Sequence, residues 1–325
     1  MTTTVDAEYQ RLVTKVALLY HQHGMKQTEI ARRFGISQPQ VSRLLEAATA
    51  MHIVRTTVLV PDGLHAELEG ALEQAYGLQD ARVTEVSDPN DEEALIRDLG
   101  IALAQQMPGL LAGAERLGLT SWSRSLRAAI SALDPVAGST VETVVEMLGD
   151  VGQPALQHES AQATATLARL LGATPRFLRV PGVTTSVAMR DGLLMHDSHA
   201  QDALAMFNTL DVALSGIAGC EATGALGPGD NFFTEEQFAF ARSLGAVGQV
   251  NLRFIAEDGS PVHSELDALV IGVTLEQLQH TPKRIGVGGG PSKCVPIRAA
   301  LRGKWLNTLV TDVDTAKWLV ANANT

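Results

Sequence analysis

Apolar positions in the first fifty residues of the chain recur every three to four residues, which is the period of an amphipathic helix. They fall into three short runs, at residues 11–24, 27–35 and 37–45. The apolar positions of these runs are Leu12, Val16, Leu19, Ile30, Ala31, Phe34, Val41, Leu44 and Leu45. Gly35 can adopt the positive φ of a tight turn, and Ser37 is a good N-cap. The pattern therefore predicts three helices, with the last two joined as a helix-turn-helix.

The polar positions of the second and third predicted helices suit the major groove of DNA. Gln and Arg side chains near a helix start can pair bidentately with adenine and guanine edges, so we expect Gln38, Gln40 and Arg43 to read bases. Residues of the second helix should lie nearer the phosphates. The predicted DNA-binding residues are Gln27, Thr28, Arg32, Ser37, Gln38, Gln40, Ser42 and Arg43. A helical hairpin used only for packing is the alternative, but side chains, turn and local charge together favour DNA binding.

Charge is unevenly distributed along the chain, whose formal net charge is −11. Residues 1–60 hold seven Lys and Arg against four Asp and Glu, a net charge of +3, so the remainder carries −14. Neutralising phosphates supplies the sequence-independent part of nucleic-acid affinity. We therefore expect only the N-terminal part to approach double-stranded operator DNA.

Two short segments follow the predicted helix-turn-helix. Residues 52–61 are rich in β-branched side chains and predict a short strand or wing that ends at a proline. Residues 62–78 have apolar positions that step by four and three, as in a coiled-coil seam. These positions are Leu64, Leu68, Ala71, Ala75 and Leu78. A helix packed on its own domain and a helix that makes a dimer contact both fit this segment.

From about residue 90 onward, short apolar runs alternate with helical stretches. The expected strands cover residues 116–122, 140–148, 211–219, 283–290 and 307–312, and the expected helices cover residues 158–172, 235–245, 292–303 and 314–323. This alternation indicates a doubly wound, Rossmann-like α/β fold, whose ligands normally lie beyond the carboxyl ends of the strands.

Three segments are therefore predicted. Residues 1–60 form an all-α helix-turn-helix domain of the winged type. Residues 61–89 form a linker or dimerisation helix and the entry to the body, and residues 90–325 form the α/β domain.

Two loops at predicted strand ends have the chemistry of anion-binding sites. The first, residues 120–125, places four hydroxyl groups and Arg124 before a helix that is expected to begin near Leu126. Backbone N–H groups at a helix start, beside a guanidinium, suit a phosphate. The second, residues 286–293, combines three consecutive glycines, which allow close backbone approach, with Lys293. Glycines that serve only a tight turn are the alternative for this loop.

No metal or cofactor is expected. The second loop is not a dinucleotide fingerprint, because Pro291 replaces the third glycine of GxGxxG. Only two cysteines occur, Cys220 and Cys294, which excludes a disulfide framework and a thiolate zinc site. His196 and His199 flank Asp197, but no fourth ligand is evident.

The composition predicts a cytoplasmic globular protein. Of the 325 residues, 45% are hydrophobic and 19% are charged. The sequence has no apolar run long enough to span a membrane and no apolar signal stretch behind a basic start. We expect no association with a membrane.

Five segments together resemble one known family. They cover residues 25–45, 118–126, 211–219, 245–259 and 286–312. In this order they are similar to the SorC family of bacterial transcriptional regulators, and the last segment is the most specific. The resemblance implies a DNA-binding domain joined to a sugar-binding domain that is similar to sugar-phosphate isomerases. It also implies homodimers or homotetramers, and a sugar or sugar-phosphate effector that changes DNA binding at a carbohydrate-catabolism operon.

The two loops and the resemblance together give the predicted effector-binding residues. These are Thr120, Ser121, Trp122, Ser123, Arg124, Ser125, Arg253, Gly288, Gly289, Gly290 and Lys293. Trp122 either stacks on a sugar face or simply packs at a strand end. Arg253 is included because the corresponding family segment keeps an arginine; an ion pair with Asp258 is its alternative.

The competing hypothesis is a sugar-phosphate isomerase or deaminase with an added DNA-binding domain. The related enzymes carry an Asp and a His just after the strand that is similar to residues 211–219. Here only Glu221 could act as a base, with no histidine beside it, so we expect a protein that is not an enzyme. Some relatives hold a deoxyribose phosphate through a Schiff-base lysine, but residues 146–150 contain no lysine, so reversible binding is expected.

Overall fold

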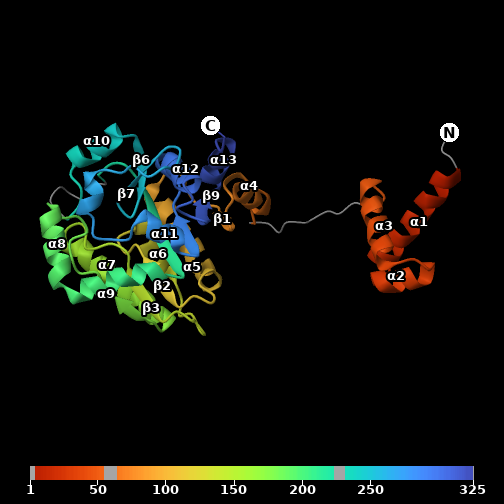
Figure 1. The fold of residues 1–325 in the computed structure, drawn as a ribbon, viewed down its shortest axis with the longest axis horizontal. Helices are drawn as coiled ribbons and strands as arrows, with labels where there is room; N and C mark the ends of the chain where they lie inside the picture. Colours follow the sequence, from red (N-terminus) through yellow and green to blue (C-terminus); the bar gives the residue numbers. More distant parts are fainter. Residues whose placement is uncertain (1–3, 55–63, 223–230, 325) are drawn as a thin grey trace. The chain divides into compact units, whose positions relative to one another are not determined.

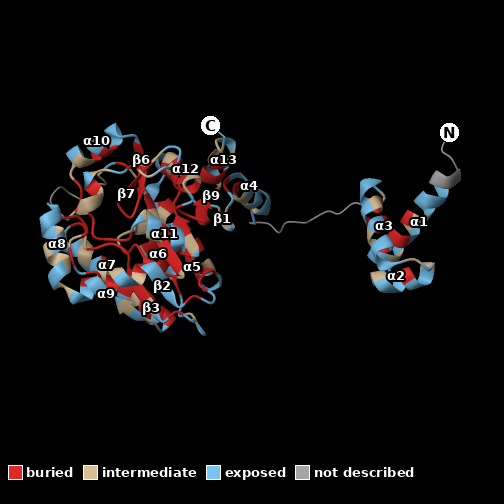
Figure 2. Cartoon of the chain, viewed as in Figure 1, coloured by how far each residue is buried: buried red, intermediate tan, exposed pale blue. Residues whose placement is uncertain are grey.

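The computed structural model describes residues 4–54, 64–222 and 231–324. The chain divides into two compact units, Met1–Pro61 and Asp62–Thr325, each with its own hydrophobic core. Figure 2 shows buried residues gathered inside each unit.

The N-terminal unit is a bundle of three helices: α1 (Thr4–His21), α2 (Gln27–Phe34) and α3 (Gln38–Ala50) (Figure 1). Gly35 ends α2 with a φ of 64°, and its backbone N–H donates to the last turn of that helix. A left-handed residue at this point allows the tight turn into α3. The three helices enclose a core that includes Val16, Ile30 and Val41. The predicted helix-turn-helix is confirmed, and most of the predicted wing at residues 52–61 lies outside the described residues.

The C-terminal unit is built on a sheet whose parallel strands have the spatial order β1-β9-β8-β5-β2-β3-β4. The strands are β1 (Asp80–Thr84), β2 (Arg116–Leu119), β3 (Thr143–Glu146), β4 (Thr174–Arg176), β5 (Val212–Gly219), β8 (Lys283–Val287) and β9 (Thr308–Asp312). The last residues of β5 also pair with β6 (Ala246–Val250), which forms an antiparallel pair with β7 (Arg253–Ala256).

Helices cover both faces of the parallel sheet (Figure 1). One face is covered by α5 (Glu92–Leu110), α6 (Arg124–Ala132) and α7 (Pro154–Leu171). The other is covered by α4 (Ala66–Tyr76), α9 (Ser198–Met206), α11 (Leu275–His280), α12 (Cys294–Arg302) and α13 (Val313–Ala321). The remaining helices are α8 (Val187–His196), α10 (Glu235–Ser243) and the 3-10 turns η1 (Phe207–Thr209), η2 (Glu265–Leu269) and η3 (Pro291–Lys293). The predicted doubly wound α/β fold is confirmed.

The direction of winding reverses between β2 and β5. From β2 the chain continues to β3 on one side, whereas β5 is followed in the sheet by β8 on the other side. In open parallel sheets the crevice at such a switch point, beyond the carboxyl ends of the strands, is where ligands bind. The loops after β2 and β8 begin at this end of the sheet.

Residues 66–84, which were predicted as a linker or dimerisation helix and an entry segment, form α4 and β1 of the C-terminal unit. β1 pairs in register with β9, from Asp80 beside Thr308 to Thr84 beside Asp312. The buried positions of α4 are Leu72 and Tyr76. Of the predicted seam positions, Leu68 and Leu78 pack against the core of this unit, whereas Leu64 and Ala75 are exposed. A dimer contact by this helix stays a prediction.

Candidate functional site

The outer face of α3 presents the predicted base-reading residues. Gln38, Gln40 and Arg43 are exposed and Ser42 is half-buried, whereas Val41, Leu44, Leu45 and Ala48 are buried. At 100° per residue, Arg43 lies opposite the centre of the buried stripe. Its Nε atom lies 3.4 Å from the carbonyl oxygen of Pro39, so the side chain leans toward the start of the helix.

Gln40 also stabilises the N-terminus of α3. Its Oε1 atom accepts from the Ser37 backbone N–H at 2.8 Å and from the Ser37 hydroxyl at 3.0 Å. This is one half of a capping box, which stabilises the start of α3. Ser37 and the Gln40 carbonyl are thus partnered within the protein, and only the amide NH2 of Gln40 is left for a base.

The predicted phosphate-contacting residues lie on α2. Thr28 and Arg32 are exposed and Gln27 is half-buried. Gln27 is the first residue of the helix. Its neighbour Lys26, which the sequence reading did not single out, is exposed at the N-cap.

A cavity of about 590 Å³ lies at the switch point of the sheet. We call it the strand-end pocket. It is lined by Glu92, Glu93, Ile96, Thr120, Trp122, Ser123, Arg124, Arg127, Leu156, Gly216, Ile217, Ala218, Gly219, Glu221, Ala222, Ser292 and Lys293. The end of β5 forms its floor, and close approach of the loop after β2 depends on Gly216, where an added Cβ would lie 2.7 Å from the Ser123 hydroxyl oxygen.

The strand-end pocket brings together five predicted effector-binding residues, Thr120, Trp122, Ser123, Arg124 and Lys293. They come from two loops separated by more than 160 positions in the sequence. The helix after β2 starts at Arg124, two residues earlier than expected, because Ser123 is its N-cap. Arg124 is therefore in the first turn of α6.

Two of the predicted hydroxyl groups are used inside the protein. Ser121 is buried and hydrogen-bonds to the carboxylate of Glu146, whose pKa burial raises. The Thr120 hydroxyl donates to Asn251 Oδ1 at 2.5 Å. Ser125 is buried and lines a smaller neighbouring cavity of about 260 Å³, together with Gly289, Gly290 and Lys293. Of the predicted serines, only Ser123 lines the strand-end pocket.

Two of the three N–H groups of the glycine loop are used inside the protein and are not available to a ligand. The Gly288 N–H donates to the Val310 carbonyl at 3.2 Å and continues the sheet. The Gly290 N–H donates to Asp312 Oδ2 at 3.0 Å and to the Thr315 hydroxyl at 2.8 Å. Within the described residues, the Gly289 N–H is the one amide of the three left for a ligand.

The charges of the strand-end pocket are mixed. Arg124 pairs with Glu92 at 3.0 Å and, more closely, with Glu93, both in the first turn of α5. Burial lowers the pKa of Lys293, an effect that the charge of Glu92 opposes and that of Arg124 reinforces. An anion beside Lys293 would favour its protonated form.

Arg127 is a pocket residue that the sequence reading missed. Its guanidinium donates to the Trp122 carbonyl oxygen at 2.6 Å and lies 3.9 Å from Glu159, and burial lowers its pKa. It lies one helical turn after Arg124, so its i, i+3 spacing to Arg124 was the available signal.

Arg253 lies outside the strand-end pocket and has a structural role. It is buried, and its guanidinium donates to the backbone carbonyls of Val273, Asp267 and Gly272. Its ion pair is with Asp267 at 3.5 Å, not with Asp258. A buried charge is kept in place by such partners, and these fix the chain around η2 to the β6–β7 pair.

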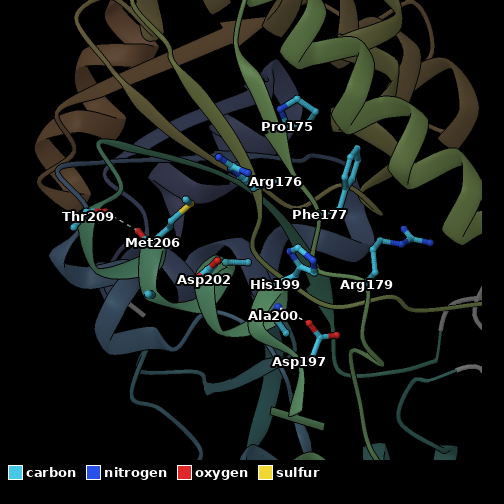
Figure 3. A pocket seen from close by; sticks show the side chains of 12 residues that line it. Pro175, Arg176, Phe177, Arg179, Asp197, His199, Ala200, Asp202, Met206 and Thr209 are labelled. Carbon is cyan, nitrogen blue, oxygen red and sulfur yellow. Dashed lines mark hydrogen bonds between the residues drawn. The ribbon is translucent and has the colours of Figure 1, made fainter. Parts of the chain in front are cut away.

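A second, larger cavity of about 630 Å³ lies at the β4 edge of the sheet (Figure 3). It is bounded by the segment that includes Arg176 and Phe177 and by α9, which contributes His199 and Asp202. None of the predicted site residues lines it.

Two structural features are absent from residues 4–54, 64–222 and 231–324. No group of three or more His, Cys, Asp or Glu side chains is placed to hold a metal ion. Among the same residues, no helix is both long and apolar enough to cross a membrane. Both cysteines are free and buried, and burial raises the pKa of Cys294.

Comparison with known proteins gives a consistent result for both units. A sugar-binding domain model matches residues 63–321, and a homeodomain-like domain model matches residues 7–52. The deoxyribonucleoside regulator of Bacillus subtilis is 30% identical over 97% of this chain and 99% of its own length. The transcriptional regulator LsrR of Klebsiella pneumoniae is 29% identical over 97% of this chain and 94% of its own length.

A solved structure agrees over the whole chain. The full-length sorbitol operon regulator SorC from Klebsiella pneumoniae matches with a TM-score of 0.72 and 26% identity, covering 98% of this chain and 100% of that one. The chain belongs to the SorC family of transcriptional regulators, which join a helix-turn-helix to a sugar-binding domain.

Proposed function

We propose that this protein is a cytoplasmic, sequence-specific transcriptional regulator of a carbohydrate-catabolism operon. Reversible binding of a sugar or sugar phosphate in the strand-end pocket would control its binding to operator DNA. Relatives named as regulators of deoxyribonucleoside and sorbitol functions support this class of effector. The main support for the proposal is that Arg124, after β2, and Lys293, after β8, line the same cavity at the switch point of the sheet.

Four lining residues and the nearby Gly289 have a part in this proposal. Lys293 and Arg124 attract a phosphate or another electron-rich group, and the Gly289 N–H in the neighbouring cavity adds a donor. Ser123 offers a hydroxyl to a sugar. Trp122 lines the pocket and is the aromatic residue proposed to stack on a sugar face.

The competing enzyme hypothesis has less support. Proton transfer on a sugar phosphate needs an acid and a base near the reacting carbons. Glu221 lines the strand-end pocket, but no histidine is among the described residues that do so. We therefore propose binding without turnover, which incubation with hexose and pentose phosphates would check.

The effector site is tested by removing the two cations that the sequence predicted, Arg124 and Lys293, one at a time. Lys293→Ala and Arg124→Ala should keep operator binding and lose the effector response, because each loses a charge-assisted hydrogen bond worth roughly 1.5 to 3 kcal/mol. That loss weakens effector affinity about ten- to a hundredfold. Lys317→Ala is a matched control, since Lys317 is 66% exposed on α13 and outside the pocket.

The measurement is operator binding titrated with the effector, after a thermal-shift screen of sugars and sugar phosphates has identified it. A ligand at 100 times its dissociation constant stabilises the folded protein by about 2.7 kcal/mol. Normal effector titrations in both variants would show that the site is elsewhere.

A further inference from the structure

The arginine that should attract an anionic effector is already occupied by the protein itself. Arg124 is bound by Glu92 and Glu93, and both carboxylates line the strand-end pocket. Glu92 also acts electrostatically on Lys293, where it opposes the lowering of the pKa by burial. Glu92 therefore acts on two of the three cations of the pocket, Arg124 and Lys293. A negatively charged ligand at Arg124 competes with these two side chains.

The exposure of the carboxylates makes the exchange feasible. The side chains of Glu92 and Glu93 are 70% and 78% exposed, whereas that of Arg124 is 39% exposed. When displaced, the two carboxylates return to water and leave no buried charge without a partner. They also remain in the first turn of α5, where the helix dipole favours negative charge. The ion pair is thus a weak, replaceable partner for Arg124.

We propose that Glu92 and Glu93 are internal competitors of the effector and set the ligand charge that the strand-end pocket accepts. A phosphate-bearing ligand must outcompete two carboxylates for Arg124, and it then replaces Glu92 as an anion that raises the pKa of Lys293. A neutral polyol leaves the ion pairs in place. This inference rests on the proposed effector site and specifies how that site selects its ligand.

The test measures binding of inorganic phosphate by titration calorimetry at constant ionic strength. The double variant Glu92→Gln/Glu93→Gln should bind phosphate roughly tenfold more tightly than the parent protein, because two negative charges within about 4 Å of Arg124 are removed. The matched control is Glu235→Gln/Glu236→Gln. These two residues also occupy a first helical turn, and Glu235 pairs with Arg242 at 2.6 Å. The control should bind phosphate as the parent does.

A third variant tests whether the tighter phosphate binding depends on Arg124. In Glu92→Gln/Glu93→Gln/Arg124→Gln the tighter binding should disappear, since no guanidinium is freed. The inference is overturned if the double variant binds phosphate no more tightly than the parent protein, or shows no detectable binding. It is also overturned if the triple variant, which lacks Arg124, still binds phosphate more tightly than the parent. If Lys293→Ala and Arg124→Ala abolish the effector response while the double variant shows no gain, this inference alone fails. If Lys293→Ala and Arg124→Ala both keep a normal effector response, the proposed effector site is wrong as well.

Discussion

Arg43 shows how one exposed side chain can be assigned from the packing of its helix. It lies opposite the buried stripe of α3, and its neighbour Gln40 is partly committed to the helix cap. Arg43 is therefore the side chain of this face that is best placed to supply a bidentate contact, and guanine is the base that arginine reads most often.

Replacing Arg43 by Ala should weaken operator binding by roughly 1 to 3 kcal/mol and relax sequence preference at one base pair. Binding to random DNA should change much less. Lys15→Ala is a suitable control, because it removes the same charge from an exposed position on α1. Competition assays with operator and random duplexes measure both quantities. Equal losses on the two duplexes would mean that Arg43 contacts phosphates only.

Two arginines illustrate what can be predicted from sequence and what cannot. Arg124 comes after a short loop that follows β2, so its place at the end of the sheet could be predicted from the sequence alone. Arg253 lies in the strand β7, but its partners come from residues 267–273, and nothing in the neighbouring sequence reveals that they enclose it. The pairing of Arg124 with Glu92 likewise depends on α5 lying beside α6.

At the scale of elements, the alternation of strands and helices was sufficient to predict the doubly wound fold. Helix faces were harder where small and large apolar residues mix. In α4 the buried positions are Leu72 and Tyr76, which the predicted seam did not include, whereas its member Ala75 is exposed. Leu72 and Tyr76 are the buried residues because burying large side chains removes more apolar surface from water. The Tyr76 hydroxyl also donates to the Leu319 carbonyl of α13.

The glycine loop between β8 and α12 supports a prediction about backbone space. An added Cβ at Gly289 would lie 2.0 Å from Asp312 Oδ2. Gly289→Ala should therefore displace the carboxylate that caps α13, lower the free energy of unfolding by roughly 1 to 3 kcal/mol and weaken effector binding.

Gly70→Ala supplies the opposite case. Gly70 is in α4 with nothing within 4 Å of its added Cβ, so this change should stabilise the protein by about 0.5 to 1 kcal/mol. Denaturant unfolding of both variants checks the pair. An unchanged or higher stability of Gly289→Ala would contradict the proposed role of the loop's tight packing.

At the scale of the whole molecule, one small helix-turn-helix contacts too few base pairs to select a site in a genome. We therefore predict that two copies of the chain bind together, on half-sites about 34 Å apart or a multiple of that distance. The operator should be a palindrome. Sedimentation of the protein with and without operator DNA measures the assembly, and a monomer at micromolar concentration in both samples would rule it out.

The hydrogen bond from the Gly290 N–H to Asp312 affects the conformational entropy that is lost when an effector binds. Since Gly290 is fixed by Asp312 and Thr315, the loop is ordered before any effector arrives, and binding loses little conformational freedom there. Such preorganisation raises affinity but leaves the loop little room to change shape. The signal that an effector is present must then start at a part of the pocket with freedom to rearrange. The exposed first turn of α5, whose carboxylates would exchange partners, is such a part.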